Sequence, residues 1–131
     1  MTAYAPSSHA SYRTSTILTA SPEQLVIMLY DGCHRFLLQA ITALREGNIV
    51  EAGERFGRAT AIIDELQRTL DLSAGVVAER LDGIYVFCRR HLGEGMSERD
   101  PAKLEQVDEL LRELRDGWAQ AAASMAVVAA T

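Results

Sequence analysis

Thiols and imidazoles occur near one another at two places in the chain. Cys33 directly precedes His34, and His91 follows Cys88 by three residues. These side chains are typical zinc ligands, so a metal-carrying redox bundle is one hypothesis. On a helix, however, adjacent residues point about 100° apart, and only Cys88 and His91 share a face. We therefore favour buried, reduced cysteines beside surface histidines, and we expect no metal ion and no cofactor.

Carboxylates are also frequent, and near the C-terminus they alternate with Arg112 and Arg115. This group is Glu105, Asp108, Glu109, Glu113 and Asp116. The spacing predicts a solvated helical face with ion pairs along it. No His follows a Glu by three residues, as a di-iron bundle requires, and the sequence holds neither a phosphate-binding loop nor a Ser-His-Asp pattern. We expect a binding protein and no enzyme.

The composition further limits the class of protein to which this chain can belong. The 131 residues are 48% hydrophobic and 24% charged, which fits one domain with a substantial core. The net charge is -5 and Lys103 is the single lysine, so we expect no nucleic-acid binding. The apolar runs are too short to cross a bilayer, and the N-terminus does not resemble a secretory signal. We expect no membrane insertion and a cytoplasmic location.

Residues 1–21 differ from the rest in composition. They include nine Ser or Thr and one charged residue, Arg13, which is typical of a segment that does not fold alone. Tyr12, Ile17 and Leu18 are apolar exceptions. We predict a flexible N-terminal strap that can fold down onto an apolar surface.

A helix is predicted over 22–46. Ser21 can cap it, Pro22 suits its first position, and Gln24 completes a capping box. Apolar residues then recur every three or four positions, whereas a strand entering a hairpin at Asp31-Gly32 would alternate. That dipeptide therefore lies inside the helix.

Three further helices are predicted over 49–71, 76–93 and 101–125, each with one apolar stripe and short connections. Residues 127–131 are expected to fray. Four such helices pack best as an antiparallel four-helix bundle, spanning 22–126, so the fold class is all-α.

The first helix has more apolar residues than one stripe needs. Its expected seam is Leu25, Leu29, Gly32, Phe36, Ala40 and Leu44. Val26, Ile27, Met28, Tyr30 and Leu38 remain to be covered. Either this helix is central and buried on several sides, or some of these residues line a groove for a partner helix. In the second case the strap would cover the groove when it is empty.

Several motifs resemble those of one known family. After Tyr12, the pattern I-x-T-A-S-P-x-x-L-x-x-x-L-Y-D-G runs from Ile17 to Gly32. Later motifs are I-I-x-E-L at 62–66, L-D at 70–71, G-x-x-A-x-x-L-x-x-x-Y at 75–85, R-R-x-L at 89–92 and V-x-x-L-L-x-x-L-x-x-x-W at 107–118. Together they resemble the flagellar secretion chaperone FliS family.

The resemblance implies a four-helix chaperone in the cytosol. Such a chaperone binds the disordered C-terminal segment of flagellin, prevents its premature polymerisation and supports its delivery to the flagellar type III export gate. The family includes members that bind the flagellar anti-sigma factor, and the residues do not decide that partner here. A dimerising helical bundle without flagellin binding is the alternative, and a homodimer is left open.

Two groups of residues have expected roles. The expected partner-binding residues are Tyr12, Ile17, Leu18, Leu25, Met28, Leu29 and Tyr30. The expected structural residues are Ser21, Pro22, Gln24, Asp31 as a polar anchor and Gly32 as a packing notch. By the resemblance, Tyr12 and Ile17 belong to the displaceable strap, with Leu25, Leu29 and Tyr30 in the helix beneath it.

Overall fold

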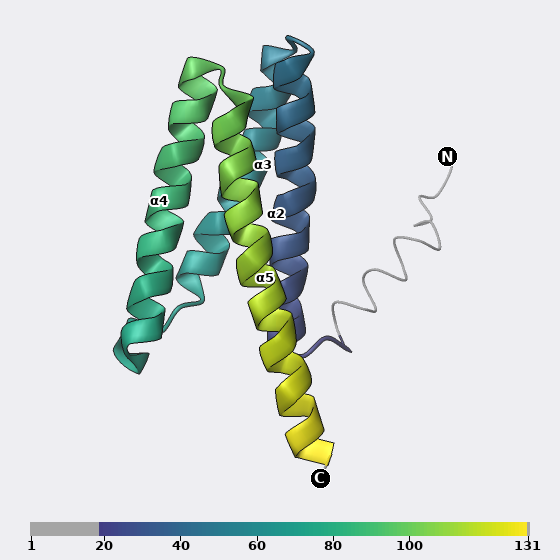
Figure 1. Ribbon diagram of the computed structural model, residues 1–131, viewed down its shortest axis with the longest axis vertical. Helices are drawn as coiled ribbons and strands as arrows, with labels where there is room; N and C mark the ends of the chain where they lie inside the picture. Colours follow the sequence, from purple (N-terminus) through teal and green to yellow (C-terminus); the bar gives the residue numbers. More distant parts are fainter. Residues whose placement is uncertain (1–18, 131) are drawn as a thin grey trace, which may run out of the picture.

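Four long helices run up and down beside one another in the computed structural model, which describes the backbone of residues 19–130 and side chains as far as 124 (Figure 1). The elements are α2 (Pro22–Arg45), α3 (Ile49–Arg68), the 3-10 turn η1 (Leu72–Ala74), α4 (Val76–Glu98) and α5 (Pro101–Ala130). Within this part of the chain there is no strand. The all-α, antiparallel bundle is thus confirmed; of the predicted strap, only residues 19–21 are described.

The start of α2 has the local structure of a capping box. The Ser21 hydroxyl accepts a hydrogen bond from the Gln24 backbone N–H at 3.2 Å, and the Gln24 side-chain oxygen accepts from the Ser21 N–H at 2.9 Å. Pro22 occupies the first turn, where its missing N–H costs nothing. Further along, a Cβ on Gly32 would lie 3.3 Å from Cδ1 of Ile62. Gly32 therefore allows α3 to pack closely against α2.

Three helix ends differ from those expected. α3 ends at Arg68 rather than 71, because Asp71 caps η1 by accepting from Ser73 N–H. α4 continues past 93 to Glu98 and ends at Arg99, which adopts a left-handed conformation with φ 54°. α5 continues past its expected end at 125 to Ala130, into the tail 127–131 that was expected to fray, in keeping with the high helix propensity of its alanines.

Gly95 lies in the extended part of α4. A Cβ at this position would lie 2.6 Å from Cδ1 of Leu104 and 3.2 Å from the carbonyl oxygen of Asp100. The glycine therefore allows the last turns of α4 to pack closely against the start of α5, and it does not end the helix. By contrast, a Cβ at Gly93 would meet nothing within 4 Å.

The buried face of α2 is rotated from the expected seam. Its buried apolar side chains are Tyr30, Cys33, Leu37, Ala40, Ile41 and Ala43. Leu29, Phe36 and Leu44 are only partly buried, at the border of this face. The reason is that α2 packs against both α3 and α5, so the centre of its contact surface lies between two neighbours.

Polar contacts join α2 to α5. Nδ1 of His34 lies 2.6 Å from Oδ1 of Asp108, and Arg45 forms an ion pair with Glu105. Asp108 is only 6% exposed, which corrects the expectation that every carboxylate of this segment is solvated. Its burial is tolerated because the His34 imidazole supplies a hydrogen-bond partner.

Candidate binding groove

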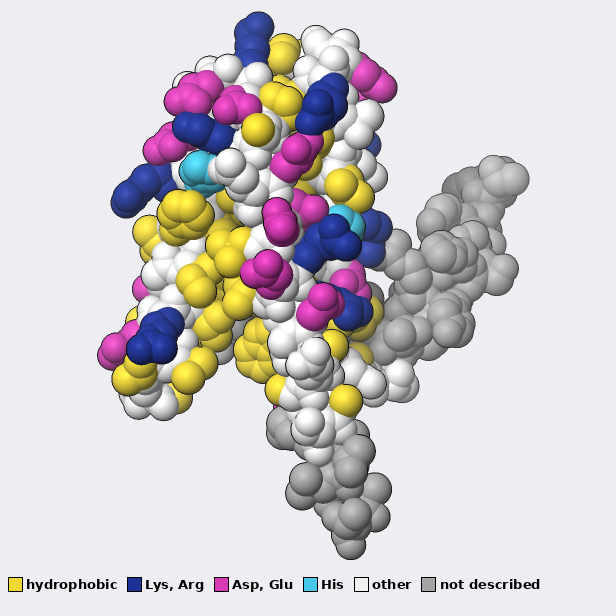
Figure 2. Space-filling view, in the orientation of Figure 1, with side chains coloured by type: hydrophobic (Ala, Val, Ile, Leu, Met, Phe, Trp, Pro, Cys, Tyr) yellow, Lys and Arg dark blue, Asp and Glu magenta, His cyan; other side chains and the backbone are white. Residues whose placement is uncertain are grey.

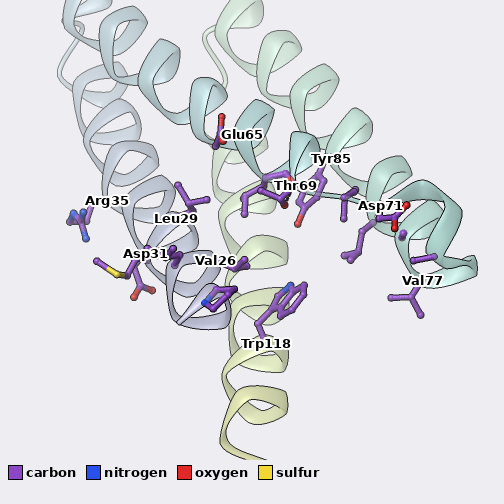
Figure 3. A pocket seen from close by; sticks show the side chains of 18 residues that line it. Val26, Leu29, Asp31, Arg35, Glu65, Thr69, Asp71, Val77, Tyr85 and Trp118 are labelled. Carbon is purple, nitrogen blue, oxygen red and sulfur yellow. Dashed lines mark hydrogen bonds between the residues drawn. The ribbon is translucent and has the colours of Figure 1, made fainter. Parts of the chain in front are cut away.

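A groove of about 1200 Å³ lies at the end of the bundle where α2 begins (Figure 3). It is bounded by the first half of α2, the end of α3, η1, the start of α4 and one side chain of α5. Its apolar lining includes Leu25, Met28, Leu29, Leu70, Leu81 and Trp118. Figure 2 shows hydrophobic side chains gathered between α4 and the lower half of α5, whereas charged side chains are frequent at the other end of this face.

The connection between α3 and α4 shapes one wall of the groove. Gly75 has φ 121°, a conformation that side chains disfavour, and it turns the chain from η1 into α4. α4 then rises at a distance from α5 and approaches it only toward its own end (Figure 1). This divergence leaves the inner faces of α2, α4 and α5 unfilled at the groove.

The groove exposes aliphatic side chains to solvent. Val77 is 74% exposed and Leu25 is 38% exposed, and both line the groove. Polar side chains lie toward its rim, where Asp31 is paired with Arg115 and Glu65 with Arg68. An apolar floor with a polar rim is suited to the apolar face of an amphipathic helix.

The structure separates the predicted partner-binding residues. Leu25, Met28 and Leu29 line the groove together. Tyr30 does not; it is 2% exposed and lies in the core, because it faces α4. Tyr12, Ile17 and Leu18 lie outside the described residues.

Sequence reasoning missed the contributions of the other helices. Val77, Leu81 and Trp118 each belong to the apolar stripe of a predicted helix, which is the usual signal of a core residue. Whether a residue of such a stripe lies in the core or in a groove depends on the distance between the helices. The sequence of a single helix does not determine that distance. The residue that comes closest to indicating the groove is Val77, an exposed apolar residue at the beginning of α4.

Two tyrosines join α2 to α4 at the groove floor. The hydroxyls of Tyr30 and Tyr85 form a short hydrogen bond. Burial raises the pKa of both phenols, so they remain protonated at neutral pH. Tyr85 lines the groove, whereas Tyr30 is behind it.

The thiols and imidazoles have separate partners. Cys33 and Cys88 are fully buried, and burial raises the pKa of their thiols to about 12 and about 11. His34 is paired with Asp108, and Nε2 of His91 lies 2.6 Å from the side-chain oxygen of Gln106. Within the described residues, no group of three or more His, Cys, Asp and Glu is placed to hold a metal ion.

The model of one protein family, described as "Flagellar protein FliS", matches residues 4–125. The chain belongs to the FliS family. It is 36% identical over 107 residues to the flagellar secretion chaperone FliS of Vibrio cholerae, covering 81% of this chain and 79% of the relative. It is 34% identical over 108 residues to FliS of Salmonella typhimurium, covering 81% and 80%.

A more distant FliS protein gives the same result. The flagellar secretion chaperone FliS of Bacillus subtilis is 29% identical over 113 residues, which cover 86% of this chain and 84% of the relative. Membership of the FliS family supports a role as a flagellar export chaperone. None of the helices described for this chain is long and apolar enough to span a membrane.

Proposed function

We propose that this FliS-family chain is a cytoplasmic chaperone that binds the disordered C-terminal segment of flagellin in the groove between α2, α4 and α5. It thereby prevents premature polymerisation and supports delivery of flagellin to the flagellar type III export gate. The observation that carries the proposal is the exposed apolar groove, lined by Leu25 and Val77, in a chain whose relatives are named flagellar secretion chaperones.

Binding would couple to folding of the client. An amphipathic segment that is unfolded in free flagellin places successive apolar side chains along the groove and becomes helical there. Ordering it costs about 2–5 kcal/mol, which burial of apolar surface on both partners offsets. Neither a nucleotide nor a catalytic step is needed, so the protein acts by binding alone.

The N-terminal strap would regulate access. Tyr12, Ile17 and Leu18 give residues 1–18 an apolar character that suits the same groove, and the Ser/Thr-rich remainder gives the segment little tendency to fold alone. Strap and client would then compete for one surface.

Two exposed valines provide a matched test. Val77 lines the groove at the second position of α4, and Val50 occupies the second position of α3 away from it, 85% exposed. Val77→Asp should weaken binding of a synthetic C-terminal flagellin peptide by about tenfold, because a valine contact removed from water contributes about 1.5 kcal/mol. Val50→Asp should leave the affinity unchanged in isothermal titration calorimetry. Equal affinities of the two variants would argue against the groove.

A second experiment with the same peptide tests the alternative of a dimerising bundle. Sedimentation of the free chain and of its mixture with the peptide reports the masses of both species. A peptide complex supports the chaperone proposal, whereas a stable dimer that binds no flagellin peptide would support the structural adaptor.

A further inference from the structure

α5 continues beyond the end of the bundle at which the groove lies. Its last turns extend past the first residues of α2 and of α4, and no other described helix accompanies them (Figure 1). We call residues 119–130 the tail of α5. Of its described side chains, those of Gln120, Ala121, Ala123 and Ser124 are exposed. The tail is therefore a helix without a packing partner among the described residues.

The sequence of the tail is nevertheless typical of a packed helix. Apart from Gln120 and Ser124, residues 119–130 are alanine, valine or methionine, and none is charged. The apolar repeat of α5 also continues into the tail. Steps of three and four residues join Leu111, Leu114, Trp118, Ala121, Met125 and Val128. This spacing is typical of a seam between two helices, whereas the core of the bundle contacts the seam only as far as Trp118.

The tail cannot fill the groove of its own molecule. α5 is one continuous helix from Pro101 to Ala130, and Trp118 already lines the groove. Beyond this residue the helix leads away from the bundle (Figure 1), so a return to the groove would require a break in the helix. The groove that the tail can reach therefore belongs to another molecule.

Two copies of the chain can cover both apolar surfaces at once. The groove and the tail lie at the same end of the molecule. Two molecules that meet at this end in antiparallel orientation place each tail beside the groove of the other. Such a twofold contact is closed and does not continue into a filament. Charge does not oppose it, because the tail has none and Asp31 at the rim is paired with Arg115.

The area of this contact is close to what a weak dimer needs. About 12 helical residues span about 18 Å, and half the surface of a helix about 10 Å wide is then about 280 Å². A twofold pair buries two such faces and the two groove surfaces beneath them, about 1,100 Å² in total. This area is near the lower limit for a specific interface, so the dissociation constant should be micromolar.

We infer that the tail of α5 docks into the groove of a second copy, against Val77, Leu81 and Trp118, and that the free protein is a reversible twofold dimer. Val77, which is 74% exposed in the single chain, is covered in this dimer. The opposite wall of the groove, with Leu25 and Leu29 of α2, is the one proposed for the strap. The inference concerns the free protein and does not require flagellin. Together with the proposed function, it means that the client displaces the tail.

Two alanines of the tail provide a matched test of its seam. Ala121 and Ala123 are both exposed, but only Ala121 belongs to the seam, and Ala123 lies on the opposite face of the helix. Ala121→Glu should weaken dimerisation by about tenfold or more, because the twofold contact would bury its carboxylate twice. Ala123→Glu adds the same charge and should leave the dissociation constant unchanged. Sedimentation equilibrium of the full chain over about 1–300 μM, without peptide, measures both.

The two exposed valines test the groove side of the contact. Val77→Asp should weaken dimerisation, because Val77 lines the groove, whereas Val50→Asp on α3 should not. Circular dichroism of each variant verifies that its helices are intact. All four substitutions replace exposed side chains, so each variant should fold.

Three results would overturn the inference. The unaltered chain could remain monomeric up to about 300 μM, well above a micromolar dissociation constant. Ala121→Glu and Ala123→Glu could change dimerisation equally, which would place the interface elsewhere. Ala121→Glu could weaken the dimer while Val77→Asp does not, which would show that the tails pair with one another outside the groove. Each result leaves the proposed function standing, because flagellin binding is measured separately, by peptide titration.

Discussion

Arg115 on α5 binds the carboxylate of Asp31 on α2 through two nitrogen atoms. Its Nε lies 2.9 Å from Oδ1 and its Nη2 lies 3.4 Å from Oδ2. Asp31 also lines the groove, so this pair fixes the rim between the two helices. The resemblance predicted Asp31 as a polar anchor but did not identify its partner, because Arg115 is 84 residues away in the chain.

Removing this pair should have a small, salt-dependent effect on stability. Both side chains are more than a third exposed, so a double-mutant cycle of Asp31→Asn and Arg115→Gln should give a coupling of about 0.2–1 kcal/mol in urea unfolding. Repeating the cycle in about 1 M NaCl should reduce the coupling, because salt screens exposed charges. A coupling that is zero at low salt would contradict the ion pair.

The glycines of α4 make a matched pair for packing. Gly95→Ala should destabilise the fold by about 1–3 kcal/mol, because the new methyl group meets Leu104 and the Asp100 carbonyl oxygen. Gly93→Ala, two residues away on the same helix, has open space and should stabilise by about 0.5–1 kcal/mol. Thermal or urea unfolding of both variants gives the comparison. If the two substitutions changed stability alike, close packing at Gly95 would be refuted.

Burial of the thiols predicts a loss of stability in alkali. The pKa of Cys33 rises from 9.0 to about 12 and that of Cys88 to about 11. Between the ordinary thiol pKa of 9.0 and these raised pKa values, the folded state keeps protons that the unfolded state has lost. The free energy of unfolding therefore falls as pH rises from about 9 toward 12. Tyr30 and Tyr85 add to this slope above their ordinary value of 10.0, since burial also raises the pKa of each.

Urea unfolding at pH 8, 9 and 10 measures this slope, and Cys33→Ala with Cys88→Ala should reduce it. In the same proteins a thiol reagent at pH 8 should react slowly with the native state and fully in urea. Rapid reaction without denaturant, or a stability that rises above pH 9, would contradict burial of the thiols.

Deleting residues 1–18 tests the proposed strap. If this segment occupies the groove in the free protein, its removal frees the binding-competent state, and affinity for the flagellin peptide should increase. Calorimetry on the full and shortened chains provides the comparison, with a thermal melt to verify folding of the bundle. Unchanged or weaker binding would remove support for the competition.

Local signals predicted the helices well, because caps and apolar spacing act within a few residues. The capping box at Ser21 starts α2 where its residues indicate. Gly95 shows the limit of such signals. It lies beyond the predicted end of the third helix at 93, and its role depends on Leu104 in another helix. A residue's neighbours across the bundle are a property of packing, not of local spacing.

The groove was predictable only on one of its sides. Met28 belonged to the surplus of apolar residues in α2, and the family resemblance pointed to Leu25 and Leu29. Neither signal distinguished these residues from Tyr30, which faces the core. Asp108 was misplaced for a related reason. Its neighbours in sequence are polar, and only the approach of His34 from α2 makes burial of its carboxylate favourable.

The tryptophan at position 118 offers the most direct measurement of the central claim, because it is the single one in the chain and it lines the groove. Titration with a tryptophan-free C-terminal flagellin peptide should shift Trp118 emission to shorter wavelength with saturation, as the half-buried indole loses water. The same titration of Val77→Asp should need about tenfold more peptide, and that of Val50→Asp should match the unaltered chain. Peptide binding detected by calorimetry with unchanged Trp118 emission and unaffected by Val77→Asp would contradict binding in the groove.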